Sequence, residues 1–232
     1  MQALPEAVTE GAFSRSAALL GEAAMSRLAA ARVLVVGVGG VGGWCAEALV
    51  RTGVGHISVM DDDVVAESNL NRQCPATASA IGRMKVDAMR ERLLAINPVA
   101  DVEARAERFT GAEDIGGYDA IVDAIDSVDC KAALVLKACE MNTPIFSSMG
   151  AALRTDPAKV RVTRFDKVSG DGLARALRRR FRESGRRGLP RFECVWSEEL
   201  PRACEGRGSL MQVTATFGMC LAAAVVRQIS CA

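Results

Sequence analysis

A glycine-rich segment at residues 37–42, GVGGVG, has the spacing of a phosphate-binding loop. Its glycines are Gly37, Gly39, Gly40 and Gly42. The first permits a tight turn, the second lets a phosphate approach the backbone, and the last lets the next helix pack closely on the preceding strand. Asp61 follows about 20 residues later, where a carboxylate can bind ribose hydroxyls. The pattern predicts a nucleotide site that does not distinguish NAD, FAD and ATP. A glycine turn needed only for packing is the alternative.

Polar residues beyond Asp61 favour ATP. Arg72 and Lys85 suit a triphosphate, because phosphoryl chemistry depends on positioning and charge neutralisation. Asp126 follows another predicted strand, at the edge where open α/β sheets bind ligands, and its carboxylate suits Mg²⁺. The alternatives are an ordinary loop arginine, a solvated helix lysine and an aspartate that caps a helix.

The counts of histidine and cysteine exclude several kinds of site. His56 is the single histidine, which argues against Ser-His-Asp triads and most histidine metal sites. No two of the eight cysteines are spaced C-x-x-C, so we expect no zinc ribbon. Cys204 lies in a glycine-rich segment between Arg202 and Arg207 and is a candidate reactive thiol, with an inactive loop cysteine as the alternative.

Positive charge is concentrated in one segment, although the whole chain has a net charge of only +1. Residues 173–191 contain eight arginines and one glutamate. Helical spacing places Leu173, Leu177 and Phe181 on a buried stripe. The candidate RNA-binding residues away from that stripe are Arg175, Arg178, Arg179, Arg180 and Arg182. Such a face suits a nucleic-acid backbone, and a solvated or salt-bridged helix face is the alternative.

The elements that position these residues alternate along the chain. Short β-branched runs predict strands, amphipathic runs predict helices, and their alternation predicts a Rossmann-like, doubly wound, mostly parallel sheet. The sequence favours an N-terminal helical arm at 1–30, a nucleotide-binding half at 31–150 and a C-terminal half at 151–232, whose antiparallel strands extend the sheet. Predicted strands are 32–36, 56–61, 99–104, 119–124, 144–148, 159–165 and 192–197. Predicted helices are 13–30, 41–51, 83–95, 131–139, 172–184 and 211–229.

Composition fits a folded domain. Half of the residues are hydrophobic and a quarter are charged. The N-terminus lacks the basic start and apolar run of a signal peptide. The apolar stretch at 211–229 contains polar and charged positions, so we expect a buried or docking helix in a cytoplasmic protein, with a membrane span as the alternative.

Several motifs together resemble the ubiquitin-activating-enzyme superfamily. They are GVGGVG at 37–42, D-x-D at Asp61 and Asp63, SNLNRQ at 68–73, G-x-x-K at 82–85, INP at 96–98 and DAIDS at 123–127. The resemblance implies that Asp61 binds ribose and Asp126 binds Mg²⁺. It assigns the phosphates and adenylate to Asp63, Asn69, Arg72, Gln73 and Lys85. It also implies a homodimer in which Arg15 reaches the ATP of the partner subunit.

Further segments resemble the bacterial family of tRNA threonylcarbamoyladenosine dehydratases. They are EALVRTGVG at 47–55, DAIDSVDCKAALV at 123–135, DPAKVRVT at 156–163, CVWSEE at 194–199 and QVTATFG at 212–218. This resemblance implies ATP-dependent cyclisation on tRNA through a carboxyl-adenylate. It also suggests a sulfur-accepting role for Cys204 beside a cysteine desulfurase. The alternatives are adenylation of a ubiquitin-like carrier protein, ATP binding without turnover and an NAD oxidoreductase.

Overall fold

A seven-stranded sheet forms the centre of the computed structural model, which describes residues 11–185, 187–206 and 208–231. The strand order is β3-β2-β1-β4-β5-β7-β6. All neighbouring strands are parallel except β6 and β7, which are antiparallel. The strands are β1 (Arg32–Val36), β2 (His56–Met60), β3 (Asp101–Arg105), β4 (Ala120–Asp123), β5 (Ile145–Ser148), β6 (Val160–Arg164) and β7 (Glu193–Ser197).

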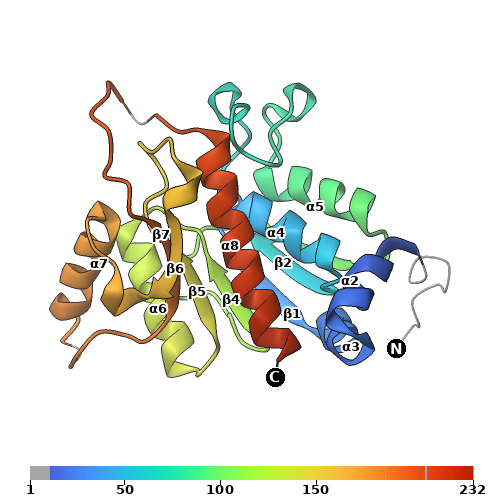
Figure 1. The fold of residues 1–232 in the computed structure, drawn as a ribbon. Coiled ribbons are helices and arrows are strands. Elements are labelled where there is room, and N and C mark those ends of the chain that lie inside the picture. Colours follow the sequence, from blue (N-terminus) through green and yellow to red (C-terminus); the bar gives the residue numbers. More distant parts are fainter. Residues whose placement is uncertain (1–10, 186, 207, 232) are drawn as a thin grey trace.

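Helices cover both faces of this sheet, and α8 crosses one face diagonally (Figure 1). The helices are α2 (Ser14–Leu20), α3 (Glu22–Ala30), α4 (Gly42–Thr52), α5 (Lys85–Ile96), α6 (Val128–Glu140), α7 (Gly172–Glu183) and α8 (Met211–Ser230). Cores on the two sides of the sheet hold α3, α4, α5 and α8 on one face and α6 and α7 on the other. The architecture is therefore a three-layer α/β fold.

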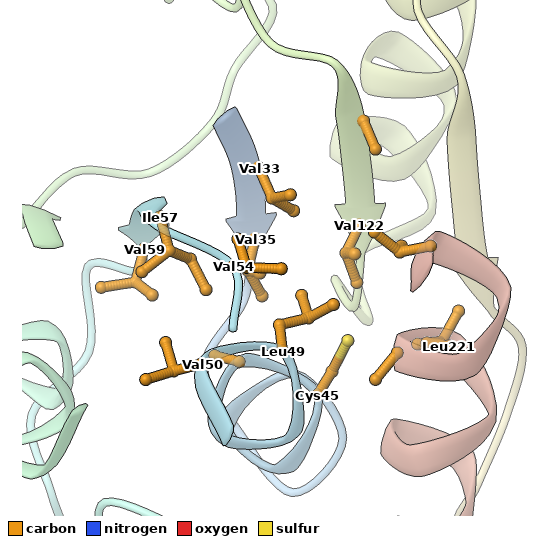
Figure 2. Close-up of a cluster of buried hydrophobic side chains, with 14 of the residues drawn as sticks. Val33, Val35, Cys45, Leu49, Val50, Val54, Ile57, Val59, Val122 and Leu221 are labelled. Atoms are coloured by element: carbon orange, nitrogen blue, oxygen red, sulfur yellow. The ribbon is translucent and has the colours of Figure 1, made fainter. Parts of the chain in front are cut away.

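Strand β1 shows why these layers form. Its side chains alternate, with Val33 and Val35 in the core under α4 and α8 and Leu34 and Val36 in the core under α6 and α7. All four are buried, as expected for a parallel strand covered on both faces. Figure 2 shows Val35 beside Leu49 of α4, and Val33 and Leu221 of α8 belong to the same buried cluster.

The predicted fold class is confirmed, and several details differ. The helix predicted at 13–30 is two helices, because Gly21 adopts a left-handed φ of 79° between them. β7 is parallel to β5, so only β6 supplies an antiparallel pairing. Leu173 is only half-buried, and the stripe of α7 that enters the core is Ala174, Leu177 and Phe181.

Helix α8 is long and apolar enough to cross a membrane by length and composition alone. Half of its most apolar window is buried inside the protein, where residues such as Phe217 and Leu221 pack in the core. A single helix of this kind is weak evidence for a membrane span. Its packing matches the buried helix that the sequence predicts.

Candidate nucleotide-binding site

A cavity of about 810 Å³ opens at the carboxyl ends of β1, β2 and β4. Loops at these ends bring together residues that are far apart in the sequence. Nearly all of the predicted nucleotide ligands line this cavity: Gly37, Gly39, Gly40, Asp61, Asp63, Asn69, Arg72, Gln73, Lys85 and Asp126. Gly42 and Arg15 do not line it.

The glycine loop connects β1 to α4 and combines packing with an open backbone. Gly37 has a left-handed φ of 88°, and a Cβ there would lie 2.8 Å from the Ala124 carbonyl oxygen. A Cβ on Gly42 would lie only 1.8 Å from the Gly37 carbonyl oxygen, so this position requires glycine for helix–strand packing. At Gly39 the nearest atom to a Cβ is Gln73 Nε2, at 3.8 Å. Gly37 and Gly42 are therefore needed for packing, whereas Gly39 leaves the backbone of the same loop open to a ligand.

Asp61 connects the end of β2 to the glycine loop. Its carboxylate accepts hydrogen bonds from the backbone N–H of Val38 at 2.8 Å and of Asp63 at 2.9 Å. Burial raises the pKa of Asp61, and the nearby charge of Lys85 opposes that shift. The carboxylate is thus held beside the loop where the sequence predicts ribose binding.

Lys85 is buried, with only 6 % of its surface exposed. Its Nζ lies 2.7 Å from Asp63 Oδ2, and its backbone N–H donates to the Asp63 carbonyl oxygen. The alternative of a solvated helix lysine is therefore wrong. The buried ammonium group of Lys85 thus lies in the cavity wall beside the Asp63 carboxylate, where it can also bind an anionic ligand.

Arg72 and Gln73 also line the cavity. The Arg72 guanidinium donates to the Ser68 carbonyl oxygen and to Asn71 Oδ1, both at 2.9 Å, and its own carbonyl accepts from the Trp44 indole. Gln73 is buried, and its Oε1 has no hydrogen-bond partner within the described part of the chain. A buried acceptor without a partner is costly, so it fits a ligand that donates a hydrogen bond here.

A buried ion pair that the sequence analysis missed holds the loop carrying Asp126. Lys131 Nζ lies 2.6 Å from Asp123 Oδ2, and both side chains are fully buried. Ser147 Oγ donates to the same carboxylate oxygen at 2.5 Å, and the backbone N–H of Ile125 donates to Asp123 Oδ1. Asp126 itself is exposed on the cavity, and α6 has Ser127 at its N-cap position. The D-x-x-D-x-x-x-x-K spacing was visible, but not the pairing across β4, β5 and α6.

The arginines of α7 do not share one role. Arg175, Arg179 and Arg182 are exposed, and Arg179 lies 3.7 Å from Glu183. Arg180 pairs with Asp129 at 2.7 Å, as the salt-bridged alternative anticipated. Arg178 is half-buried and points inward, which favours a structural role for this candidate over RNA binding.

The inward contacts of Arg178 are structural. Its guanidinium donates to the carbonyl oxygens of Phe165 at 3.0 Å and Val168 at 2.6 Å, and it lies 5.0 Å from the Phe165 ring centroid. Arg186, in the same arginine-rich segment, lies outside the described residues.

Arg15 lies far from the cavity of its own chain. Arg15 is exposed on α2. Phe13, two residues before it, lies near Gly53 at the C-terminal end of α4, since a Cβ built on Gly53 would be 3.7 Å from the Phe13 ring. The glycine loop adjoins the other end of this 11-residue helix, which spans roughly 16 Å. Within one chain the structure therefore does not bring Arg15 to the nucleotide residues. Residues 1–10 of the predicted arm lie outside the described residues.

The cysteines divide into inert and accessible thiols. Burial raises the pKa of Cys74 and of Cys194 to about 12 each, so both thiols stay protonated. Cys204 is exposed, and its Sγ lies 3.7 Å from the Gly206 carbonyl oxygen. Arg202 pairs with Glu199, and Arg207 lies outside the described residues.

Comparison with known proteins agrees with this geometry. The tRNA threonylcarbamoyladenosine dehydratase of Escherichia coli is 36% identical over 88% of this chain and 80% of that protein. The enzyme of the same name from Bacillus subtilis is 37% identical over 82% and 75%, respectively. A crystal structure of the E. coli enzyme, TcdA, in complex with AMP matches with a TM-score of 0.93 and 35% identity, covering 99% of this chain and 98% of that one.

The same enzyme in complex with ATP matches with a TM-score of 0.92 over 98% of this chain and 96% of that one. The molybdopterin-synthase adenylyltransferase of E. coli is similar over a shorter region, at 33% identity over 66% of this chain and 61% of that protein. Residues 13–231 match the ThiF family, which covers the sheet, the cavity and the helices around them. The chain belongs to the ThiF family.

Proposed function

We propose that this protein is an ATP-dependent tRNA threonylcarbamoyladenosine dehydratase. The observation that carries the proposal is the near-complete structural match to the AMP-bound enzyme of that name, in a chain whose predicted nucleotide ligands line one cavity. A bound adenosine nucleotide fits this cavity: Asp61 offers a carboxylate for ribose, and Gln73 offers a buried acceptor that has no partner among the residues the structure describes.

The reaction requires a better leaving group than the substrate carboxylate has. A carboxylate oxygen of the threonyl group attacks the α-phosphorus of ATP, and pyrophosphate leaves. The carbamoyl group then attacks the activated carbonyl carbon, loses a proton and expels AMP, which carries away one carboxylate oxygen. The nucleoside loses one water in total. Because the attacking group belongs to the same molecule, proximity replaces a protein nucleophile.

The cavity residues can support these steps without histidine. The chain's only histidine, His56, lies at the amino end of β2, away from the cavity. Lys85 and Arg72 supply positive charge beside the phosphates, and the open backbone at Gly39 allows close approach. Asp126 would hold Mg²⁺, which neutralises charge on the departing pyrophosphate.

The remaining assignments belong to this proposal. Exposed arginines of α7, chiefly Arg175, Arg179 and Arg182, contact tRNA phosphates. A homodimer brings Arg15 of one chain to the nucleotide of the other. The enzyme works in the cytoplasm, where its tRNA substrate is available. Cys204 is exposed and is the candidate sulfur acceptor from a cysteine desulfurase.

The direct test is incubation of the purified protein with Mg·ATP and tRNA that carries threonylcarbamoyladenosine. Mass spectrometry should find that the nucleoside has lost one water, with one AMP formed for each nucleoside converted. An unchanged nucleoside despite ATP binding would reject the proposal. It would instead favour an adenylyltransferase that acts on a ubiquitin-like carrier protein. The adenylate at the C-terminus of that carrier protein could then be sought.

A further inference from the structure

The cavity has a second wall that the nucleotide ligands do not explain. It consists of residues 150–153, which follow β5, and of Gly172, Leu173 and Ala176 on the first turns of α7. These residues are glycine, alanine or leucine, so this wall offers apolar contact and backbone groups but no charged side chain. It therefore suits an uncharged planar group better than a phosphate.

Leu153 fixes one side of this wall in an unusual backbone conformation. Its φ is 64°, in the left-handed region that leucine seldom adopts. Its N–H donates to the Gly208 carbonyl oxygen at 2.9 Å, and its own carbonyl accepts from the Arg202 N–H at 2.8 Å. Strained residues held in this way occur preferentially at ligand sites.

A buried ion pair holds the other side. Arg154 Nη2 lies 2.9 Å from Asp171 Oδ2, and both side chains are almost fully buried. Asp171 also caps α7 by accepting from the Ala174 N–H at 2.8 Å, and it accepts from the Gly150 N–H at 3.2 Å. One carboxylate thus fixes the start of α7 relative to residues 150–153. Arg154 and Asp171 are positioning residues for the wall.

Helix α7 connects this wall to the outside of the protein. Its first turns line the cavity, and the same helix carries the exposed Arg175, Arg179 and Arg182. A nucleic acid bound along these arginines would have its backbone outside and one nucleotide at the cavity mouth. Enzymes that modify a base often turn it out of the stack into a pocket.

We propose that this wall is the subsite for the modified nucleoside of tRNA, with the adenine and its substituent against Gly172, Leu173 and Ala176 and the threonyl carboxylate directed toward the nucleotide. The inference rests on the proposed dehydratase function. It adds that recognition of the modification takes place at the start of α7, separately from recognition of the tRNA backbone.

Gly172 allows a selective test. Among the described residues, a Cβ at Gly172 would have no atom within 4 Å, and the φ of Gly172 is outside the left-handed region. A larger side chain can therefore enter the cavity without disturbing the fold. We suggest Gly172→Phe and, as a smaller variant, Gly172→Leu. Glu140→Phe, at the far end of α6, is a control that adds the same side chain to the surface.

The experiment measures three quantities for each variant: binding of an ATP analogue, dehydration, and binding of tRNA with and without the threonylcarbamoyl group. The Gly172 variants should retain analogue binding and binding of unmodified tRNA, but lose the preference for modified tRNA. Their kcat/KM should fall by about 100-fold, whereas Glu140→Phe should behave as wild type.

Two outcomes would overturn the subsite. One is dehydration at the wild-type rate in both Gly172 variants. The other is loss of analogue binding in both variants, which would place the nucleotide itself against Gly172. Failure of the wild-type protein to dehydrate the nucleoside would instead reject the proposed function, and the subsite with it.

Discussion

Gln73 is a residue at which we expect ligand binding to come at a cost in stability. Its Oε1 is buried without a partner among the described residues, next to the open backbone of Gly39. Such an atom costs about 1–3 kcal/mol in the free protein. A ligand that donates a hydrogen bond here recovers that cost on binding.

Gln73→Met should therefore weaken ATP binding while the free energy of unfolding stays the same or rises. The near-isosteric side chain keeps the packing and removes the unpaired oxygen. Calorimetric titration with ATP and urea unfolding of the free protein measure the two effects. Lower stability together with unchanged ATP affinity would show that Gln73 serves only the fold.

At the scale of elements, the buried pair Asp123–Lys131 connects β4 to α6 below the loop that carries Asp126. Lys131→Met leaves the Asp123 carboxylate without its counter-ion and should destabilise the protein by about 3–5 kcal/mol. The double variant Lys131→Met/Asp123→Asn removes the stranded charge and should recover part of that loss. Urea unfolding of all three proteins tests this, and equal stability of the single and double variants would contradict it.

On helix α7 we expect the exposed arginines to affect tRNA binding and the inward-pointing Arg178 to affect stability. Arg179→Ala and Arg182→Ala should weaken tRNA binding and reduce its dependence on salt, because each exposed arginine contributes to phosphate neutralisation. Arg178→Ala should chiefly lower stability, since the Val168 carbonyl loses the donor that Arg178 supplies and the Phe165 carbonyl loses one of its two donors, keeping the Val168 N–H at 3.3 Å. Filter binding across a salt series and thermal unfolding distinguish the two effects. Full tRNA affinity in the double variant Arg179→Ala/Arg182→Ala would show that this face of α7 is a solvated surface that does not bind tRNA.

These elements also show what could be predicted from sequence. The central parallel strands β1, β2 and β4 were predictable because each is a short apolar run rich in β-branched residues, and the glycine loop identified the cavity. The pairs Asp123–Lys131 and Arg154–Asp171 were not, since each forms only when the chain folds back on itself. The inward turn of Arg178 was missed because helical spacing does not reveal a carbonyl acceptor on a neighbouring segment.

For the whole molecule, the position of Arg15 bears on whether one chain forms the complete active site or two chains share it. It lies beyond the C-terminal end of α4, whereas the cavity lies at the N-terminal end. If a partner subunit supplies Arg15, the inactive variants Arg15→Ala and Asp126→Ala should restore activity when subunits are exchanged. Random pairing would give heterodimers with one intact site and about a quarter of wild-type activity.

The control for that experiment is each variant alone, which should stay inactive at every protein concentration. Asp126→Ala should also keep its fold, because Asp126 is an exposed loop residue. Activity of Arg15→Ala alone, or a mixture that remains inactive after confirmed subunit exchange, would contradict a shared site.

If the cavity activates a carboxylate by adenylation, one oxygen of that carboxylate must leave with AMP. The most direct measurement uses tRNA whose threonyl carboxylate carries a heavy-oxygen label, incubated with the protein and Mg·ATP. Mass spectrometry of the products should find one labelled oxygen in AMP and none in pyrophosphate, and Asp126→Ala should yield no labelled AMP. AMP without the label, formed while the nucleoside loses water, would contradict the account, because the oxygen would then have left by a route that does not pass through an adenylate.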